Sequence, residues 1–503
     1  MDVQLKGTQK RLYDYQAQDL TSIFDHLEKA EDDVNMLYQL PTGGGKTVVF
    51  SEIARRFLEL KQKKVIVLTH RIELSLQTSR MLTEFQVKNM IINSEVKALD
   101  ASDDHQCFVA MVETLNNRLQ EGAISLSNVG LVIIDEAHYN SFRKLFKYFE
   151  NSAILGVTAT PLSSNIKLPM KDNYSKLIVG ESIEALIKKK YLAKAKMANY
   201  DVSLKTLKLG IHGDYTVKSS DELYGNHQML GKLLKSYEEL AQGTKTLIFN
   251  NGISTSRYVY ETFKKAGYDI RHLDNKNTAS ERREILDWFA KTDNAILTSV
   301  SILTTGFDEP TVETIILNRA TRSLTLYFQM IGRGSRILPG KEEFTVIDLG
   351  NNIARFGMWD APVDWQEIFY FPDFYLENIK NDDDIEREFI YELPDDIREK
   401  FVKSETLDFD VKAEYKKIFA QGLKSKTVLE RSIAQHAQIC VENSEDVFDA
   451  RILAKLLKEE IAFRVRQYSY CIMNNTKSYK EWLEEDYERK LRLKISQEFA
   501  AKL

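Results

Sequence analysis

The stretch QLPTGGGKT (residues 39–47) decides the fold of the first part of the chain. It follows a short apolar run, NMLYQL (35–40), and precedes VVFSEIARRFLEL (48–60), whose apolar residues recur with helical spacing. A glycine-rich turn between a strand and a helix points backbone N–H groups at phosphate oxygens, so the stretch predicts a phosphate-binding loop. The alternative is a plain glycine turn. The strict pattern G-x-x-x-x-G-K-[ST] is not met, because Leu40 holds the first glycine position.

Each residue type in this loop suits a nucleotide site. The glycines turn the chain without Cβ clashes, the lysine is predicted to contact the β- and γ-phosphates, and the following threonine is predicted to ligate Mg²⁺. By itself, the loop does not separate kinases, GTPases and motors. The predicted nucleotide-binding residues of the loop are Thr42, Gly43, Gly44, Gly45, Lys46 and Thr47.

Apolar runs that alternate with helical patterns extend from this loop through much of the chain. Such runs begin at KVIVLTH (64–70) and start again at KTLIFNN (245–251), and this pattern predicts parallel sheets covered by helices on both faces. The fold class is therefore α/β, with two tandem parallel-sheet domains and a mostly helical C-terminal region. The predicted boundaries are 1–165 for the first domain, 166–240 for a crossover plus an insertion, 241–371 for the second domain, and 372–503 for an acidic linker and a helical accessory domain.

Composition bounds the function. The 503 residues are 43% hydrophobic and 28% charged, with a net charge of −5, so any nucleic-acid site is expected to be a local cleft and not a basic coat. The three cysteines lie far apart, which argues against zinc and disulfides, and no run is long and apolar enough to span a membrane. The start of the sequence has no apolar signal region, so a reducing, cytoplasmic location is predicted.

Two further stretches of the first domain carry chemistry. VIIDEAH (132–138) delivers two carboxylates to a strand end, where Asp135 is predicted to hold Mg²⁺ and Glu136 to polarise the attacking water. GVTATP (156–161) ends the next strand, and the hydroxyls of Thr158 and Thr160 could bond His138 or Asp135. The alternatives are a solvated acidic turn and an ordinary strand-end turn.

The second domain has no phosphate loop, but it has positively charged side chains that could reach a bound nucleotide. In QMIGRGSR (329–336), Arg333 and Arg336 lie three residues apart and are predicted to share a helix face and to reach the γ-phosphate as arginine fingers. A basic surface helix is the alternative. In LTTGFDEP (303–310), Asp308 could accept a hydrogen bond from ribose, and Thr304 and Thr305 could touch a nucleic-acid backbone.

Taken in order, PTGGGKT, DEAH, TAT, TTGFDEP and QMIGRGSR resemble motifs I, II, III, V and VI of superfamily 2 helicases, over roughly residues 8–360. The resemblance implies two RecA-like domains with ATP and Mg²⁺ between them and nucleic acid crossing both. It also implies that Gln16 reads adenine, that His138 bridges towards Gln329, and that two segments contact the nucleic-acid backbone. Those contacts fall near Thr69, His70, Arg71 and Thr114.

Within the superfamily, QMIGRGSRILPG and LTTGFDEP resemble the bacterial RadD-type and restriction-enzyme motor branch, although the cysteine-rich zinc segment of the RadD type is missing. The resemblance implies an ATP-dependent helicase or translocase, acting on DNA in preference to RNA, in repair, recombination or phage defence. Two alternatives stay open: an ATPase subunit of a larger restriction or defence complex, and an RNA remodeller.

The C-terminal region differs from the motor part. Residues 373–410 hold 14 Asp and Glu against 5 Lys and Arg, which favours a solvated linker. Residues 451–503 mix basic residues with aromatics such as Tyr479 and Trp482. This mixture could stack bases, but its helical spacing favours a bundle core or a docking surface for a protein partner.

Overall fold

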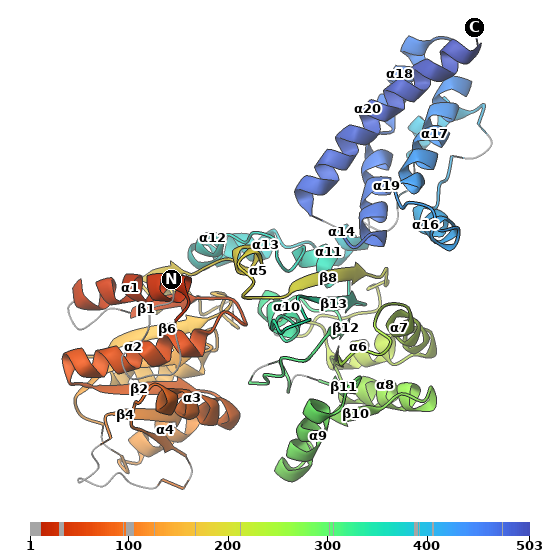
Figure 1. The fold of residues 1–503 in the computed structure, drawn as a ribbon. Helices are drawn as coiled ribbons and strands as arrows, with labels where there is room; N and C mark the ends of the chain where they lie inside the picture. Colours follow the sequence, from red (N-terminus) through yellow and green to blue (C-terminus); the bar gives the residue numbers. More distant parts are fainter. Residues whose placement is uncertain are drawn as a thin grey trace.

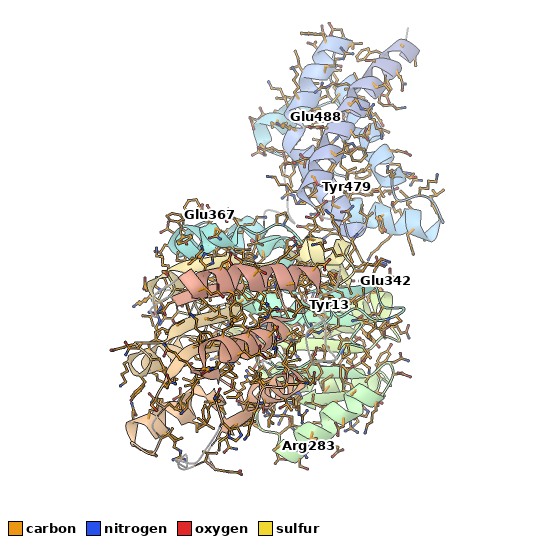
Figure 2. The ribbon with its side chains drawn as sticks, turned by 60° about the vertical axis from the view of Figure 1, so that its left-hand side comes forward. Tyr13, Arg283, Glu342, Glu367, Tyr479 and Glu488 are labelled. Carbon is orange, nitrogen blue, oxygen red and sulfur yellow. The ribbon has the colours of Figure 1, made fainter. Side chains whose placement is uncertain are left out.

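The computed structural model describes residues 12–29, 35–93, 95–96, 105–124, 126–165, 167–211, 213–300, 302–304, 306–386, 391, 393–404, 407–474 and 476–502. Two sheet domains lie side by side, and a helical C-terminal region projects from the second (Figure 1). Figure 2 shows from another side how the C-terminal helices project from the sheet domains, with Tyr479 and Glu488 in the projecting helices and Arg283 in the second sheet domain. The predicted α/β fold with a helical C-terminal region is therefore confirmed.

The first domain is a seven-stranded parallel sheet in the order β3-β4-β2-β5-β6-β1-β7. Its central strands are buried end to end, which explains the unbroken apolar runs in the sequence. The strands are β1 (Asn35–Gln39), β2 (Lys64–Thr69), β3 (Asn89–Ile92), β4 (Cys107–Met111), β5 (Val129–Asp135), β6 (Ala153–Thr158) and β7 (Lys176–Val179). The helices are α1 (Asp14–Lys29), α2 (Lys46–Lys61), α3 (Ile72–Glu84), α4 (Val112–Gln120), η1 (Asn140–Tyr148) and η2 (Met170–Asp172).

The second domain is a six-stranded parallel sheet in the order β10-β11-β9-β12-β13-β8. Its strands are β8 (Lys194–Asn199), β9 (Thr246–Asn250), β10 (Ile270–Leu273), β11 (Ile296–Ser299), β12 (Thr314–Asn318) and β13 (Glu343–Asp348). Its helices are α6 (Val217–Tyr224), α7 (His227–Leu240), α8 (Ile253–Lys265), α9 (Ala279–Lys291), α10 (Leu324–Ile331) and α11 (Asn352–Phe356). The stretch 166–240, predicted as a crossover plus an insertion, supplies the edge strand of each sheet, β7 to the first and β8 to the second.

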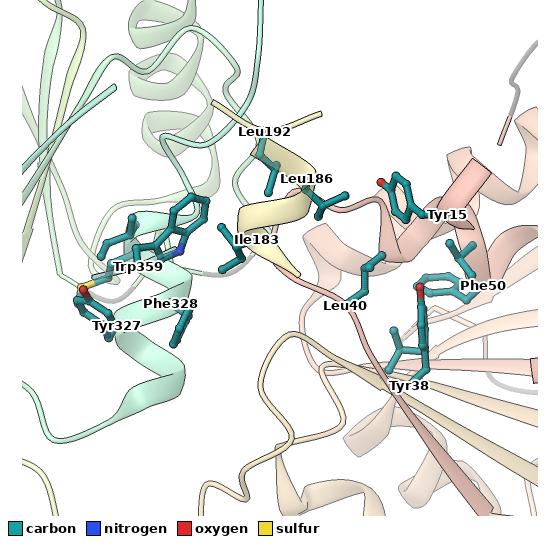
Figure 3. Close-up of a cluster of buried hydrophobic side chains, with 14 of the residues drawn as sticks. Tyr15, Tyr38, Leu40, Phe50, Ile183, Leu186, Leu192, Tyr327, Phe328 and Trp359 are labelled. Carbon is teal, nitrogen blue, oxygen red and sulfur yellow. The ribbon is translucent and has the colours of Figure 1, made fainter. Parts of the chain in front are cut away.

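A short helix, α5 (Ile183–Lys188), joins the two domains. The Ser182 hydroxyl caps it by accepting from the Ala185 N–H at 3.2 Å. Figure 3 shows its residues Ile183 and Leu186 between Leu40 of the first domain and Phe328 of the second. These side chains belong to one buried apolar cluster that runs through both domains, so the hydrophobic effect holds the two sheets against each other.

The C-terminal region has a separate core. The stretch 450–468 forms parts of two helices that are divided at Leu457. Among the described residues, no helix is long and apolar enough to cross a membrane. Helices α12 (Trp365–Tyr370) and α13 (Pro372–Glu377) pack on the sheet domains, and α14 (Asp382–Glu386) places Ile385 against Ala354 and Tyr470. The helices around the separate core are α15 (Asp395–Arg398), η3 (Glu399–Phe401), α16 (Val411–Ala420), α17 (Thr427–Glu442), α18 (Val447–Leu456), α19 (Lys458–Cys471) and α20 (Lys477–Lys502).

Candidate functional site between the two sheet domains

The glycine-rich loop joins β1 to α2 and lies against the second domain. Gly43 and Gly45 have φ of 91° and 85°, a left-handed conformation that favours glycine. A Cβ on Gly43 would lie 2.7 Å from the Leu192 side chain and 2.9 Å from the Ser335 hydroxyl, so no other residue fits there without displacing its neighbours. The free N–H groups at the start of α2 can bind an anion, and residues beyond α10 close over them.

Gln16 lies directly on this loop. Its Nε2 donates to the Gly44 carbonyl at 3.0 Å, and its Oε1 accepts from the Tyr13 N–H at 3.0 Å, with the side chain 2% exposed. The Tyr15 hydroxyl donates to the same Gly44 carbonyl at 2.7 Å. In this arrangement, both the nitrogen and the oxygen of the Gln16 amide form hydrogen bonds within the protein. An adenine base, which Gln16 is predicted to contact, would have to replace one of these bonds.

The acidic pair lies at the end of β5, where Asp135 is the last residue of the strand, and both carboxylates interact with Lys46. Glu136 has a φ of 52°, and its N–H donates to Asp135 Oδ1 at 3.0 Å. Burial, reinforced by the charge on Glu136, raises the pKa of Asp135. Burial also opposes ionisation of Glu136, but the positive charges of Lys46 and Arg333 outweigh it and lower the pKa of Glu136. Two crowded carboxylates beside one lysine suit a hard cation with oxygen ligands such as Mg²⁺, for which Asp135 and Thr47 would be the ligands.

Lys46 supplies a positive charge beside this acidic pair. Its Nζ donates to the Leu40 carbonyl at 3.3 Å. Burial lowers the pKa of Lys46, while the negative charges of Glu136 and Asp135 act in the opposite direction. An anionic ligand beside Lys46 would therefore favour its charged form.

His138 links the acidic pair to the end of β6. Its Nδ1 lies 3.0 Å from Thr158 Oγ1 and 3.4 Å from Glu136 Oε2. Because the Thr158 hydroxyl donates to the Thr160 carbonyl at 3.0 Å, its oxygen is left to accept, and the proton of His138 therefore lies on Nδ1. Burial lowers the pKa of His138, which keeps the ring neutral.

Contacts between the domains continue at α10. The Thr160 hydroxyl donates to Thr325 Oγ1 at 2.9 Å. The expected bridge from His138 to Gln329 is not made: His138 Nε2 and Gln329 Nε2 are both buried without a hydrogen-bond partner in the described part of the chain.

The two arginines do not share a helix face, so that prediction is wrong. Helix α10 ends at Ile331, and Arg333 and Arg336 lie in the turn and extended segment that follow. Gly332 and Gly334 allow this close turn: a Cβ on Gly334 would lie 2.3 Å from the Phe344 ring. Both guanidinium groups nevertheless act electrostatically on Lys46, which places them at the same site.

Residues 303–310 hold the two arginines in place. Arg333 donates to the carbonyls of Thr304, at 2.6 Å, and Phe307. Burial lowers the pKa of Arg333 to about 10, so the group stays charged at neutral pH. Asp308, predicted to bind ribose, instead pairs with Arg336, whose Nε lies 2.7 Å from Asp308 Oδ1. Thr305 lies outside the described residues.

The predicted nucleic-acid contacts of the first domain differ in exposure. Thr69 is fully buried, with its Oγ1 2.7 Å from Ser75 Oγ, so its hydroxyl is directed inward. Arg71 crosses to the second domain, where its Nη1 donates to the Ile302 carbonyl at 3.1 Å. Thr114, in α4, is partly exposed. His70 lies beside Tyr139, with ring centroids 4.2 Å apart.

Sequence reasoning missed several residues at this site. Tyr15 is adjacent to Gln16 and Ser335 stands between the two arginines, so neighbourhood to predicted residues could have found both. Tyr139 likewise follows the predicted His138, although its contact with His70 joins residues remote in the sequence. Thr325 had no signal, because its contact is with Thr160, which is remote in the sequence. In the described ranges, no group of three or more His, Cys, Asp and Glu residues forms a metal cage.

Comparisons with known proteins agree with this architecture. Residues 9–163 match the family described as "Type III restriction enzyme, res subunit", and residues 226–338 match "Helicase conserved C-terminal domain". With two RecA-like sheets that meet at a phosphate loop, these matches place the chain in the superfamily 2 helicases, of the restriction-enzyme and IRC3 type. Use of ATP follows from that family.

Three relatives match this chain over 66–70% of its length. A 51.5 kDa protein of a Lactococcus phage is 29% identical over 66% of this chain and 69% of its own length. IRC3 of Saccharomyces cerevisiae, named as an ATP-dependent helicase, is 27% identical over 70% of this chain. A subunit of the type I restriction enzyme EcoAI of Escherichia coli is 23% identical over 66% of this chain. The matches span only 53% of IRC3 and 45% of the EcoAI subunit.

One solved structure covers 96% of this chain and 42% of its own: the type ISP restriction-modification enzyme LlaBIII bound to DNA, with a TM-score of 0.54 and 15% identity. At this identity, the likeness shows the fold alone, and it extends over nearly all of the chain.

Proposed function

We propose that this protein is an ATP- and Mg²⁺-dependent DNA helicase or translocase that serves in repair, recombination or phage defence. The observation that carries the proposal is the shared site: Thr42 and Gly43 of the phosphate loop lie against Gly332, Ser335 and Arg336 of the other domain. A nucleotide held in that loop would be contacted from both domains, so binding and hydrolysis can change the distance between them.

Residue roles follow from the geometry of the site. The loop N–H groups and Lys46 bind the phosphates, and Thr47 with Asp135 would hold Mg²⁺, which shields phosphate charge when bound. Glu136, whose pKa is lowered and whose Oε2 is buried without a hydrogen-bond partner, can accept a proton from the attacking water. Arg333 and Arg336 stabilise the charge that develops on the γ-phosphate.

The proposed contacts to nucleic acid lie in segments that follow strands of both sheets. Arg71, Thr114 and the segment around Thr304 come from both domains, so closure would alter their spacing along a phosphate backbone. Contacts to the backbone carry no sequence information, as a translocating motor requires. DNA is favoured over RNA because the family matched by residues 9–163 and the Escherichia coli relative are named as restriction enzymes. The resemblance to the RadD type stays a prediction.

The experiment is steady-state ATPase with single-stranded, duplex, forked and branched DNA, and with RNA. The wild-type protein is expected to be stimulated by DNA. Lys46→Ala and Glu136→Gln are expected to abolish stimulated hydrolysis while circular dichroism shows an intact fold. Wild-type rates in either variant would refute the assignment.

A second candidate is the motor subunit of a larger restriction or defence complex, without unwinding of its own. The separate helical C-terminal core and relatives named as subunits favour it. Strand separation by the isolated chain would support the first candidate, whereas DNA-stimulated ATPase without strand separation would support the second. Stimulation by RNA alone would instead indicate an RNA remodeller.

A further inference from the structure

Three rings connect the loop after β2 to the acidic pair after β5. The Tyr139 ring lies between two histidines, with its centroid 4.2 Å from that of His70 and 4.3 Å from that of His138. At the far end of this column, His138 Nδ1 lies 3.4 Å from Glu136 Oε2. The column therefore joins a residue of the predicted nucleic-acid groove to the predicted general base.

His70 is unusual for a packed residue. Both of its ring nitrogens are buried without a hydrogen-bond partner, as is Glu136 Oε2. A buried polar group without a hydrogen-bond partner lowers the stability of the fold by roughly 1–3 kcal/mol. At a position with only a packing role, an apolar ring would therefore be more stable than histidine. Burial lowers the pKa of His70 to about 4, and the ring is thus neutral, with one donor and one acceptor free.

The next residue ties the same loop to the second domain. Arg71 Nη1 donates to the Ile302 carbonyl at 3.1 Å, and two residues further along, the Thr304 carbonyl accepts from Arg333 at 2.6 Å. A movement of the loop at 70–71 would therefore reach Glu136 through the rings and Arg333 through residues 302–304.

We propose that His70 is a positioning residue, and that the His70–Tyr139–His138 column sets the orientation of Glu136 according to where the nucleic-acid groove holds the loop at 70–71. The inference rests on the proposed function and adds its regulation: occupation of the groove is transmitted to the hydrolytic carboxylate by ring packing. The rings are tilted and tightly packed, and they transmit displacement because packed aromatic groups resist compression.

The test is ATP hydrolysis by His70→Ala, Tyr139→Ala and the double variant at saturating DNA. A carboxylate misplaced by about 1 Å can lose roughly 100-fold in rate, so we expect each single variant to lower stimulated kcat by roughly 10- to 100-fold. KM for ATP and Kd for DNA should change less than about threefold, because neither residue is assigned to the ATP phosphates and both ring nitrogens of His70 are buried, out of reach of a DNA backbone. The double variant should be no worse than the worse single variant, since both break one column.

Conservative variants distinguish a role of the ring contacts in hydrolysis from a loss of local structure. Tyr139→Phe keeps the ring and is expected to retain most of the stimulation, and His227→Ala, at an exposed histidine on α7, is the control. If His70→Ala does not fold, His70→Gln takes its place. Unchanged stimulated kcat, additive losses, or parallel losses in kcat and in DNA affinity would overturn the inference. A wild-type protein that no nucleic acid stimulates would refute the proposed function instead.

Discussion

Substitution of Gly332 by alanine tests whether the two domains meet as described. Gly332 ends α10 with φ −58° and ψ −15°, a conformation that alanine adopts freely. A Cβ at this position would lie 2.7 Å from Cβ and Cγ2 of Thr42 in the phosphate loop, and 2.9 Å from the Phe328 carbonyl of its own helix. The variant therefore places one methyl group between the domains without altering the loop itself.

The expected magnitude follows from the overlap. Carbon atoms pack best at about 3.5–4.0 Å, so the domains must separate by about 1 Å to accept the methyl group. Overpacking of this kind costs roughly 1–3 kcal/mol. The population of closed molecules, in which the two domains touch at Thr42 and Gly332, would therefore fall by roughly 5- to 160-fold. DNA-stimulated kcat should fall by a comparable factor, whereas ATP affinity should fall much less, because Lys46 and Thr47 stay in place in the first domain.

The assay pairs steady-state ATPase at saturating ATP and DNA with titration of a fluorescent ATP analogue. Gly225→Ala is the matched control: Gly225 ends α6 of the same domain, and its Cβ would meet the Asp221 carbonyl of its own helix at 2.6 Å and the Tyr258 ring, also of the second domain, at 3.1 Å. Equal losses in the two variants would indicate local strain alone. Wild-type turnover in Gly332→Ala would refute the closed arrangement as the hydrolysing state.

Three further outcomes are expected. Arg333→Ala should lower kcat by on the order of 10³-fold with little loss of ATP affinity, and equal loss of both would contradict a finger role. Glu73→Lys breaks the interdomain ion pair with Arg282 (2.6 Å, side chains 44% and 28% exposed), so low-salt turnover should fall by at most about fivefold and the Glu73→Arg/Arg282→Glu swap should restore it. Burial lowers the pKa of His436 to about 4, so the folded state binds fewer protons than the unfolded state between pH 4 and 6.5. Stability of the C-terminal helices should therefore fall by about 3 kcal/mol as pH drops through that window, and His436→Asn should flatten the dependence in thermal melts.

Strong periodic segments were predictable, and weak edge elements were not. The buried central strands appear in the sequence as apolar runs, whereas β3 has only four residues and is half-buried, so it gave no comparable signal. Strand β8, KAKMAN, exposes alternate lysines at the edge of its sheet and was read as part of a polar insertion. The spacing of Arg333 and Arg336 predicts a shared helix face, but α10 ends at Ile331 and Gly332 caps it before either arginine.

The sequence by itself determined the α/β class, the phosphate loop and the acidic strand end, because each depends on residues that are neighbours in the chain. Strand, turn and helix start are local properties of backbone conformation and apolar period. Only the tertiary structure decided that Gly43 touches Ser335, that Asp308 pairs with Arg336, and that Tyr139 lies between two histidine rings. The Gly43–Ser335 contact exists only because the packing of α5 and the shared apolar cluster bring the two sheets together. The other two contacts form within one domain: for example, β2 and β5 are neighbours in the first sheet, so the loops that carry His70 and Tyr139 lie side by side.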